Sequence, residues 1–200
     1  MIALSKKFAL ELPADEDEVA SEVAAAPAPP AVCDVGELVA REYPAVWRFL
    51  RRLGVPEVQV DDAAQRVFAR VLAQRERISA GSERAYLMRA AFRSALEQQR
   101  ENKRWLSRSS ELETDAVSSR SPLPDQTLVQ REELALLDRA LGELSPELRA
   151  VFTLSALEEL SFSEIALALQ VPRGTVASRV RRAKERFTQA VRRLQAGANR

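Results

Sequence analysis

The sequence predicts an all-α fold with two small helical domains joined by a flexible linker. Apolar side chains recur at three- and four-residue steps along most of the chain, which is the spacing of amphipathic helices. Gly is rare, at 6 of 200 residues, whereas the strong helix formers Ala, Leu, Glu and Arg are common. A polar segment without periodicity separates two helical stretches, which indicates two domains rather than one.

Residues 1–33 are expected to form a disordered extension that is first acidic and then rich in Pro and Ala. Residues 11–22 hold six acidic side chains and no basic one. Pro27, Pro29 and Pro30 follow and prevent a stable helix. An alternative interpretation is a regulatory arm that mimics the charge of DNA or docks a partner.

Residues 34–105 are expected to form a domain of three helices. Gly54 ends the first helix, and Asp61 and Asp62 are expected to open the second, because acidic side chains are favourable at a helix N-terminus. The third helix is expected from residue 83 to about residue 105. The predicted apolar stripes contain Leu38, Tyr43, Val46, Trp47, Leu50, Leu53, Ala64, Val67, Phe68, Val71, Leu72, Leu87, Ala90, Ala91 and Ala95.

Residues 106–127 are polar, contain two prolines and are expected to be the flexible linker. The second domain is expected over residues 128–194, followed by a tail at 195–200. Within it, Ser145 and Pro146 favour a helix start, since Ser caps a helix and Pro fits its first position. Helices are predicted at residues 128–144, 148–157, 163–169 and 174–194.

The last two predicted helices have the pattern of a helix-turn-helix. A short helix, a tight turn at Val171 and Pro172, and an arginine-rich helix follow one another within residues 160–186. In this motif the second helix enters the major groove of DNA, where Arg reads guanine and Lys, Ser and Thr hold phosphates. Residues 171–200 carry nine basic residues and one acidic residue, which supports nucleic-acid binding. The alternative is a solvated basic helix that binds nothing specific.

The composition excludes several other classes of protein. The chain has no His and a single Cys, Cys33, so a His-based catalytic triad, a zinc site and an internal disulfide are excluded. No catalytic residue, metal or cofactor is therefore predicted. No run approaches the ~20 apolar residues that a membrane span needs, and acidic residues interrupt the N-terminal region where a signal peptide would be apolar. We expect a cytoplasmic protein without membrane insertion.

The C-terminal half resembles region 4 of bacterial sigma factors of the extracytoplasmic-function (ECF) class. The resemblance rests on a segment before the helix-turn-helix and on the motif itself. The matching residues are Leu144, Pro146, Arg149, Val151, Phe152, Ser161, Glu164, Ile165, Ala166, Leu169, Val171, Pro172, Gly174, Thr175, Val176, Ser178 and Arg179. This half alone also resembles response-regulator-type activators.

The N-terminal half is similar to region 2 of the same family. Residues 61–70 match its D-x-x-Q-[ED]-V-F-x-[RK] helix, and residues 85–91 match its A-W-L-x-R-I-A segment. The two modules appear in the family's order with a linker of fitting length. The resemblance implies a sigma factor that binds core RNA polymerase at the β′ clamp and the β flap, binds promoter DNA and is controlled by an anti-sigma factor.

The resemblance also implies residue roles. Polymerase contacts are implied for Asp61, Asp62, Gln65 and Arg70. Contacts to the −10 element are implied for Arg89, Arg93, Arg100, Lys103 and Arg104. Contacts to the −35 element are implied for Arg173, Thr175, Ser178, Arg179, Arg181, Arg182 and Lys184. The structural alternatives are a helix cap for Asp61 and Asp62, a solvated face for the −10 group, and core or rim packing for Tyr86 and Trp105.

Four positions depart from the family pattern. Arg66 stands where an acidic residue is usual, Arg93 replaces a common Asn, Gln170 replaces the usual Gly of the turn, and Ala177 replaces a common Lys or Arg. These departures leave two other hypotheses open: a stand-alone helix-turn-helix regulator that does not act as a sigma factor, and a degenerate sigma factor that titrates an anti-sigma factor.

Overall fold

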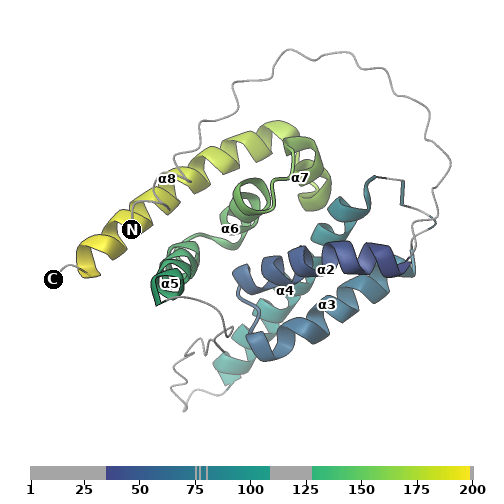
Figure 1. The fold of residues 1–200 in the computed structure, drawn as a ribbon, viewed down its shortest axis with the longest axis horizontal. Coiled ribbons are helices and arrows are strands. Elements are labelled where there is room, and N and C mark those ends of the chain that lie inside the picture. Colours follow the sequence, from purple (N-terminus) through teal and green to yellow (C-terminus); the bar gives the residue numbers. More distant parts are fainter. Residues whose placement is uncertain (1–34, 75, 77, 80, 109–127, 199–200) are drawn as a thin grey trace.

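The computed structural model describes residues 35–74, 76, 78, 79, 81–108 and 128–198. Within these residues every regular element is helical, which confirms the predicted fold class (Figure 1). The predicted extension at 1–33 lies outside them, as does the predicted linker from residue 109 onward. The elements are α2 (Val35–Arg52), α3 (Glu57–Leu72), α4 (Glu83–Arg108), α5 (Leu128–Gly142), α6 (Pro146–Phe152), the π-helical turn η2 (Thr153–Leu157), α7 (Phe162–Leu169) and α8 (Arg173–Ala198).

The prediction that Asp61 and Asp62 open the second helix is wrong. Helix α3 starts one turn earlier, at Glu57, with Pro56 as its N-cap residue. The backbone N–H of Gln59 donates to the Pro56 carbonyl at 2.9 Å, so the chain turns directly after the proline. Pro has a φ suited to a helix start, and this local geometry outweighs the charge preference that motivated the prediction.

Two other helices are longer than predicted. Helix α4 continues to Arg108, into the first residues assigned to the linker, and α8 continues to Ala198, into the predicted tail. The helix predicted at residues 148–157 begins two residues earlier, at Pro146, and from Thr153 onward it is the π-helical turn η2. The predicted cap is present, since the Ser145 hydroxyl accepts from the Leu148 N–H.

Helices α2, α3 and α4 pack around one set of buried side chains. These include Val46 and Leu50 of α2 and Leu87 and Ala91 of α4, which lie on the predicted stripes, and Phe49 of α2, which the prediction missed. Most stripe residues are buried because period-3.6 apolar spacing places them on one face of each helix. Tyr43 and Trp47, at the edge of the stripe on α2, are only partly buried.

Helices α5, α6 and α7 pack against the long helix α8. Phe152 of α6 and Phe187 of α8 stack at their centre, with ring centroids 4.4 Å apart and an interplanar angle of 27°. Val176, Val180 and Ala183 continue the buried face of α8. Because this face lies against the other three helices, the opposite face of α8 is turned outward along its length (Figure 1).

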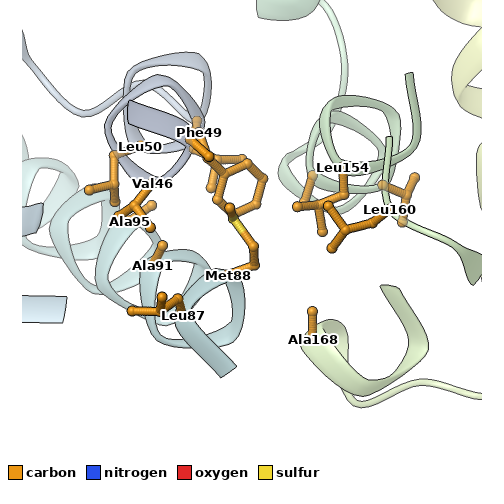
Figure 2. Close-up of a cluster of buried hydrophobic side chains, with 14 of the residues drawn as sticks. Val46, Phe49, Leu50, Leu87, Met88, Ala91, Ala95, Leu154, Leu160 and Ala168 are labelled. Carbon is orange, nitrogen blue, oxygen red and sulfur yellow. The ribbon is translucent and has the colours of Figure 1, made fainter. Parts of the chain in front are cut away.

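The two groups of helices share a buried interface, which the periodicity did not predict. Phe49 of α2 and Met88 of α4 lie opposite Leu154 and Leu160 of the second group, with Ala168 of α7 beside them (Figure 2). Helix α4 packs along α7, and α2 approaches η2. In the residues that the structure describes, no helix is long and apolar enough to cross a membrane.

The turn between α7 and α8 contains a non-glycine residue in the left-handed region. Gln170 caps α7 with φ 55° and ψ 46°. A left-handed conformation costs an L-residue about 1–2 kcal/mol, whereas Gly adopts it freely but loses more entropy on folding. Gln170→Gly and Gln170→Ala both remove the side-chain amide, which accepts a hydrogen bond from Arg93, but only the Ala variant keeps the strain. We therefore expect the Gly variant to be more stable than the Ala variant by about 0.5–1 kcal/mol, seen as a difference of a few degrees in Tm. Equal Tm values in the two variants would contradict the explanation.

Candidate nucleic-acid interface

Helices α7 and α8 form the predicted helix-turn-helix. Ser161 and Glu164 form a reciprocal capping box at the start of α7, and the hydrogen bonds from Ser161 lower the pKa of Glu164 below its ordinary value. The Val171 N–H closes the turn by donating to the Ala166 carbonyl at 3.2 Å. Helix α8 then starts directly after Pro172, so its first turns project from the motif as those of a recognition helix do.

The predicted −35 residues follow the outward face of the first turns of α8. Arg173, Arg181 and Arg182 are exposed, and their guanidinium groups form no ion pair with any residue that the structure describes. Thr175, Ser178, Arg179 and Lys184 are partly buried. The Ser178 hydroxyl donates to the Thr175 carbonyl at 3.0 Å, so it has only its lone pairs to offer a ligand. The exposed guanidinium groups are suited to phosphates and to the edges of guanines.

The predicted −10 residues share one face of α4. Arg89, Arg93, Arg100 and Arg104 differ by four, seven and four positions, which places them within about 60° of each other around the helix. The Arg89 guanidinium lies 5.8 Å from the centre of the Tyr86 ring, so Tyr86 supports a cation there. The side chain of Lys103 lies outside the described residues, as does that of Trp105.

Arg93 already has a partner from the other group of helices. Its Nη2 donates to Oε1 of Gln170, in the turn of the helix-turn-helix, at 2.5 Å. Both residues depart from the family pattern, and the structure brings them together although 77 positions separate them. One predicted −10 residue is thus already bound to the turn of the helix-turn-helix.

The predicted polymerase residues are all exposed on α3. Asp61 Oδ1 accepts two hydrogen bonds from α2, from the Tyr43 hydroxyl at 2.7 Å and from the Trp47 indole at 3.0 Å. Partial burial raises the pKa of Tyr43, and its hydrogen bond to the Asp61 carboxylate adds to the rise. Both acidic residues lie in the second turn of α3, so neither is a helix cap. Asp61 instead joins α3 to α2.

Arg66 of α3, which stands where the family usually has an acidic residue, lines a neighbouring recess. The recess has a volume of about 410 Å³ between α3 and α4. Arg66 shares its wall with acidic side chains, so the local charge is mixed rather than purely acidic. The lining residues are Gln59, Asp62, Arg66, Ser94, Glu97, Gln98 and Glu101.

The distinct surroundings of Asp61 and Asp62 lead to a prediction. Asp61→Ala removes both hydrogen bonds from α2 and is expected to destabilise the chain by about 1–3 kcal/mol, measured by urea unfolding. Asp62 makes no hydrogen bond or ion pair with a described residue, so Asp62→Ala is expected to cost less than about 0.5 kcal/mol. Equal losses in the two variants would contradict the bracing role of Asp61.

A buried ion cluster joins α2 and α4 to the residue after η2, and no pattern in the sequence indicates it. Glu158, directly after η2, is 3% exposed and binds Arg48 and Arg52 of α2, each at 2.9 Å. Arg84 of α4 donates to the Glu158 carbonyl at 3.0 Å. Burial lowers the pKa of Arg52, and the Glu158 carboxylate opposes that shift. Glu158 is one of two adjacent acidic residues in a connecting segment, a pattern that ordinarily indicates solvent exposure.

Comparisons with known proteins match the two groups of helices separately. A family model described as Sigma-70 region 2 matches residues 38–105, and one described as Sigma-70, region 4 matches residues 134–187. The RNA polymerase sigma-E factor of Streptomyces coelicolor is 32% identical over 159 residues, covering 78% of this chain and 85% of that protein. The ECF RNA polymerase sigma factor SigE of Mycolicibacterium smegmatis is 30% identical over 151 residues, but this chain spans only 59% of its length.

Two solved structures have similar folds. The sigma factor RpoE in complex with the anti-sigma factor NepR from Bartonella quintana matches with a TM-score of 0.66 and 21% identity, covering 80% of this chain and 97% of that one. CnrH in complex with the cytosolic domain of CnrY matches with a TM-score of 0.56 and 26% identity, covering 78% of this chain and 85% of that one.

Proposed function

We propose, from the premise that this chain belongs to the ECF class of RNA polymerase sigma factors, that it binds core RNA polymerase and directs it to promoters. It would act in the cytoplasm, where the polymerase works, and would contribute recognition rather than catalysis of its own. Residues 34–105 would form the unit for the polymerase and the −10 element. Residues 128–194 would form the unit for the −35 element.

The observation that carries this proposal is the pair of basic helix faces. The outward face at the start of α8 presents Arg173, Arg181 and Arg182 from a helix-turn-helix, the arrangement that reads duplex DNA in the major groove. The second face, on α4, presents cations beside an aromatic ring, as at Arg89 and Tyr86. Such a surface suits the backbone and unstacked bases of an opened strand. A sigma factor needs both kinds of recognition.

The partners follow from this assignment. The exposed face of α3 with Asp62 and Gln65 would contact the β′ clamp, and region 4 would contact the β flap. Because RpoE of Bartonella quintana was solved in complex with the anti-sigma factor NepR, we also propose that an anti-sigma factor binds this chain. Recovery of the chain from cells with polymerase alone, under every condition tried, would count against the anti-sigma factor.

The test is competition for core polymerase. The purified chain is mixed with sigma-free bacterial core enzyme, and binding is followed by gel filtration in the presence of increasing housekeeping sigma factor. One-to-one binding that the housekeeping factor displaces is the expected result. Affinity for duplex DNA without affinity for core enzyme would instead assign the chain to stand-alone regulators. Binding to an anti-sigma factor alone would make it a decoy.

A further inference from the structure

Residues 11–22, which we call the acidic arm, have no role in the function proposed above. The arm holds six acidic side chains and no basic one, and residues 15–18 are four acidic residues in succession. No other stretch of the sequence has more than two acidic residues in succession. Like charges at this density repel one another in water, so we expect the arm to bind a cationic surface within its reach. It lies outside the described residues.

The outward face of α8 is a cationic surface without a partner of its own. Helix α8 carries eight basic residues and a single acidic one, Glu185. Arg173, Arg181 and Arg182 are exposed, and none of them forms an ion pair with a residue that the structure describes. Adjacent guanidinium groups repel each other, and a polyanion relieves that repulsion. The face therefore suits a run of carboxylates as well as it suits phosphates, since both accept charge-assisted hydrogen bonds from Arg.

The basic face of α4 fits the arm less well. Helix α4 carries seven basic residues but also three acidic ones. Two of these, Glu97 and Glu101, are exposed and lie within one turn of Arg100, so they would repel the carboxylates of the arm. Arg93 of the same face already donates to Gln170. Charge complementarity therefore favours α8.

The arm is close enough in the chain to reach this face. It ends at Glu22, and 12 residues separate Glu22 from Val35, where α2 begins. A connection of that length spans up to about 45 Å at about 3.5 Å per residue. Helix α8, with 26 residues, is shorter, at about 39 Å. The route from α2 to α8 passes α4 and α7, and packed helices lie only about 8–10 Å apart.

We propose that the acidic arm docks on the outward face of α8 and competes there with DNA. Its carboxylates pair with Arg181 and Arg182, the same groups that the proposed −35 contact needs. The chain thus carries its own competitor for the recognition helix. The competition rests on the proposed function, whereas the docking does not.

A weak contact is enough for this role. Each exposed pair of a carboxylate and a guanidinium contributes little on its own. A tether of about a dozen residues gives an effective concentration of the order of millimolar, so several weak pairs together occupy the face for most of the time. An arm that occupies the face about nine-tenths of the time weakens the apparent affinity for DNA about tenfold. The denser charge of a DNA backbone can still displace it.

The docking can be measured without DNA. The probe is a labelled synthetic peptide of residues 9–24, added to the full chain in which the arm's own run of carboxylates is neutralised. This arm-neutral variant carries Asp15→Asn, Glu16→Gln, Asp17→Asn and Glu18→Gln. Fluorescence anisotropy should show binding that weakens as salt rises, because exposed charges are screened. A control peptide with its six acidic residues replaced by the matching amides should not bind.

Two matched double variants of the arm-neutral chain locate the bound peptide. Arg181→Ala/Arg182→Ala on α8 should weaken peptide binding about tenfold or more. Arg100→Ala/Arg104→Ala removes the same charge from exposed positions of α4 and should change the binding by less than about twofold. Circular dichroism checks that each variant is folded. An equal loss in the two double variants, or no peptide binding at all, would overturn the docking.

The competition is measured with a labelled duplex of mixed sequence, about 20 base pairs or two helical turns long. The arm-neutral variant should bind this duplex about tenfold more tightly than the parent chain at low salt. A matched control loses four exposed acidic charges elsewhere, because any loss of acidic charge favours DNA binding to some extent. It carries Glu37→Gln, Glu76→Gln, Glu132→Gln and Glu147→Gln. An equal gain in the two variants would overturn the competition.

The remaining outcomes separate the arm from the proposed function. Peptide binding at α8 with no duplex binding in any variant would support the docking and refute the DNA-reading role of α8. Equal duplex binding by the parent and arm-neutral chains, without peptide binding, would refute the arm and leave the proposed function standing. A parent chain that elutes as a dimer in gel filtration, beside a monomeric arm-neutral variant, would assign the arm to a second copy and overturn docking within one chain.

Discussion

Replacing Phe152 with alanine is expected to destabilise the second group of helices by about 3–5 kcal/mol. Phe152 is 2% exposed and stacks on Phe187 of α8, so the substitution leaves a cavity under the recognition helix. The rigid helices around it close such a cavity only in part. Because domains of this size are stable by only about 5–15 kcal/mol, the loss is a large share of the total.

The measurement is urea unfolding followed both by circular dichroism and by tryptophan fluorescence. The two tryptophans of the chain are Trp47 on α2 and Trp105 on α4, so fluorescence reports on the first group of helices while circular dichroism reports on both. The Phe152 variant should lose its second group at lower urea, while the tryptophan signal changes later. Phe162→Ala is the matched control, since Phe162 is only partly buried on α7 and should cost much less. An equal cost in both variants would contradict the central role of the Phe152–Phe187 stack.

The helices were predictable because their information is local. Apolar residues at three- and four-residue steps determine which face of each helix is buried, and this held for α2, α3, α4 and α8. The Ser145-Pro146 start was predictable for the same reason. The start of α3 was not, since Asp61 was judged on charge alone while Pro56 fixed the backbone.

The interface between the two groups could not be predicted in this way. Glu158 follows an apolar helix in a polar connecting segment, and nothing near it in the sequence indicates its three arginine partners. Arg93 and Gln170 were each visible as departures from a family pattern, but only the folded chain shows that they meet. Contacts between residues 74 to 110 positions apart depend on how whole helices pack, and local periodicity carries no information on that.

For the candidate site, the sequence predicts where the arginines of α8 lie but not which part of the DNA each one contacts. The structure places Arg173, Arg181 and Arg182 on an open face of a recognition helix, which is the location that a DNA contact requires. Exposure alone does not distinguish a base contact from a phosphate contact. That distinction depends on chemistry at the DNA, and it has a measurable consequence in the salt dependence of binding.

The double variant Arg181→Ala/Arg182→Ala is expected to weaken binding to a −35 duplex about a hundredfold or more. Each guanidinium that contacts a base bidentately contributes about 1–3 kcal/mol, and the two are adjacent on the exposed face of α8. The matched control is Arg186→Ala/Arg192→Ala, which removes the same charge further along the same helix. Fluorescence anisotropy with a labelled duplex measures both, and a similar loss in the control would mean that only overall charge matters.

The salt dependence then separates the two kinds of contact. If Arg182 holds a phosphate, Arg182→Ala reduces the slope of log K against log salt by about 0.9 and weakens all sequences alike. If it reads a guanine, the slope hardly changes and discrimination is lost at one base pair only. We expect the base-reading pattern for Arg182. For Arg173 we expect the phosphate pattern, because it is the first residue of α8 and lies beside the turn. The reverse result would mean that α8 lies in the groove in a different orientation from the one proposed.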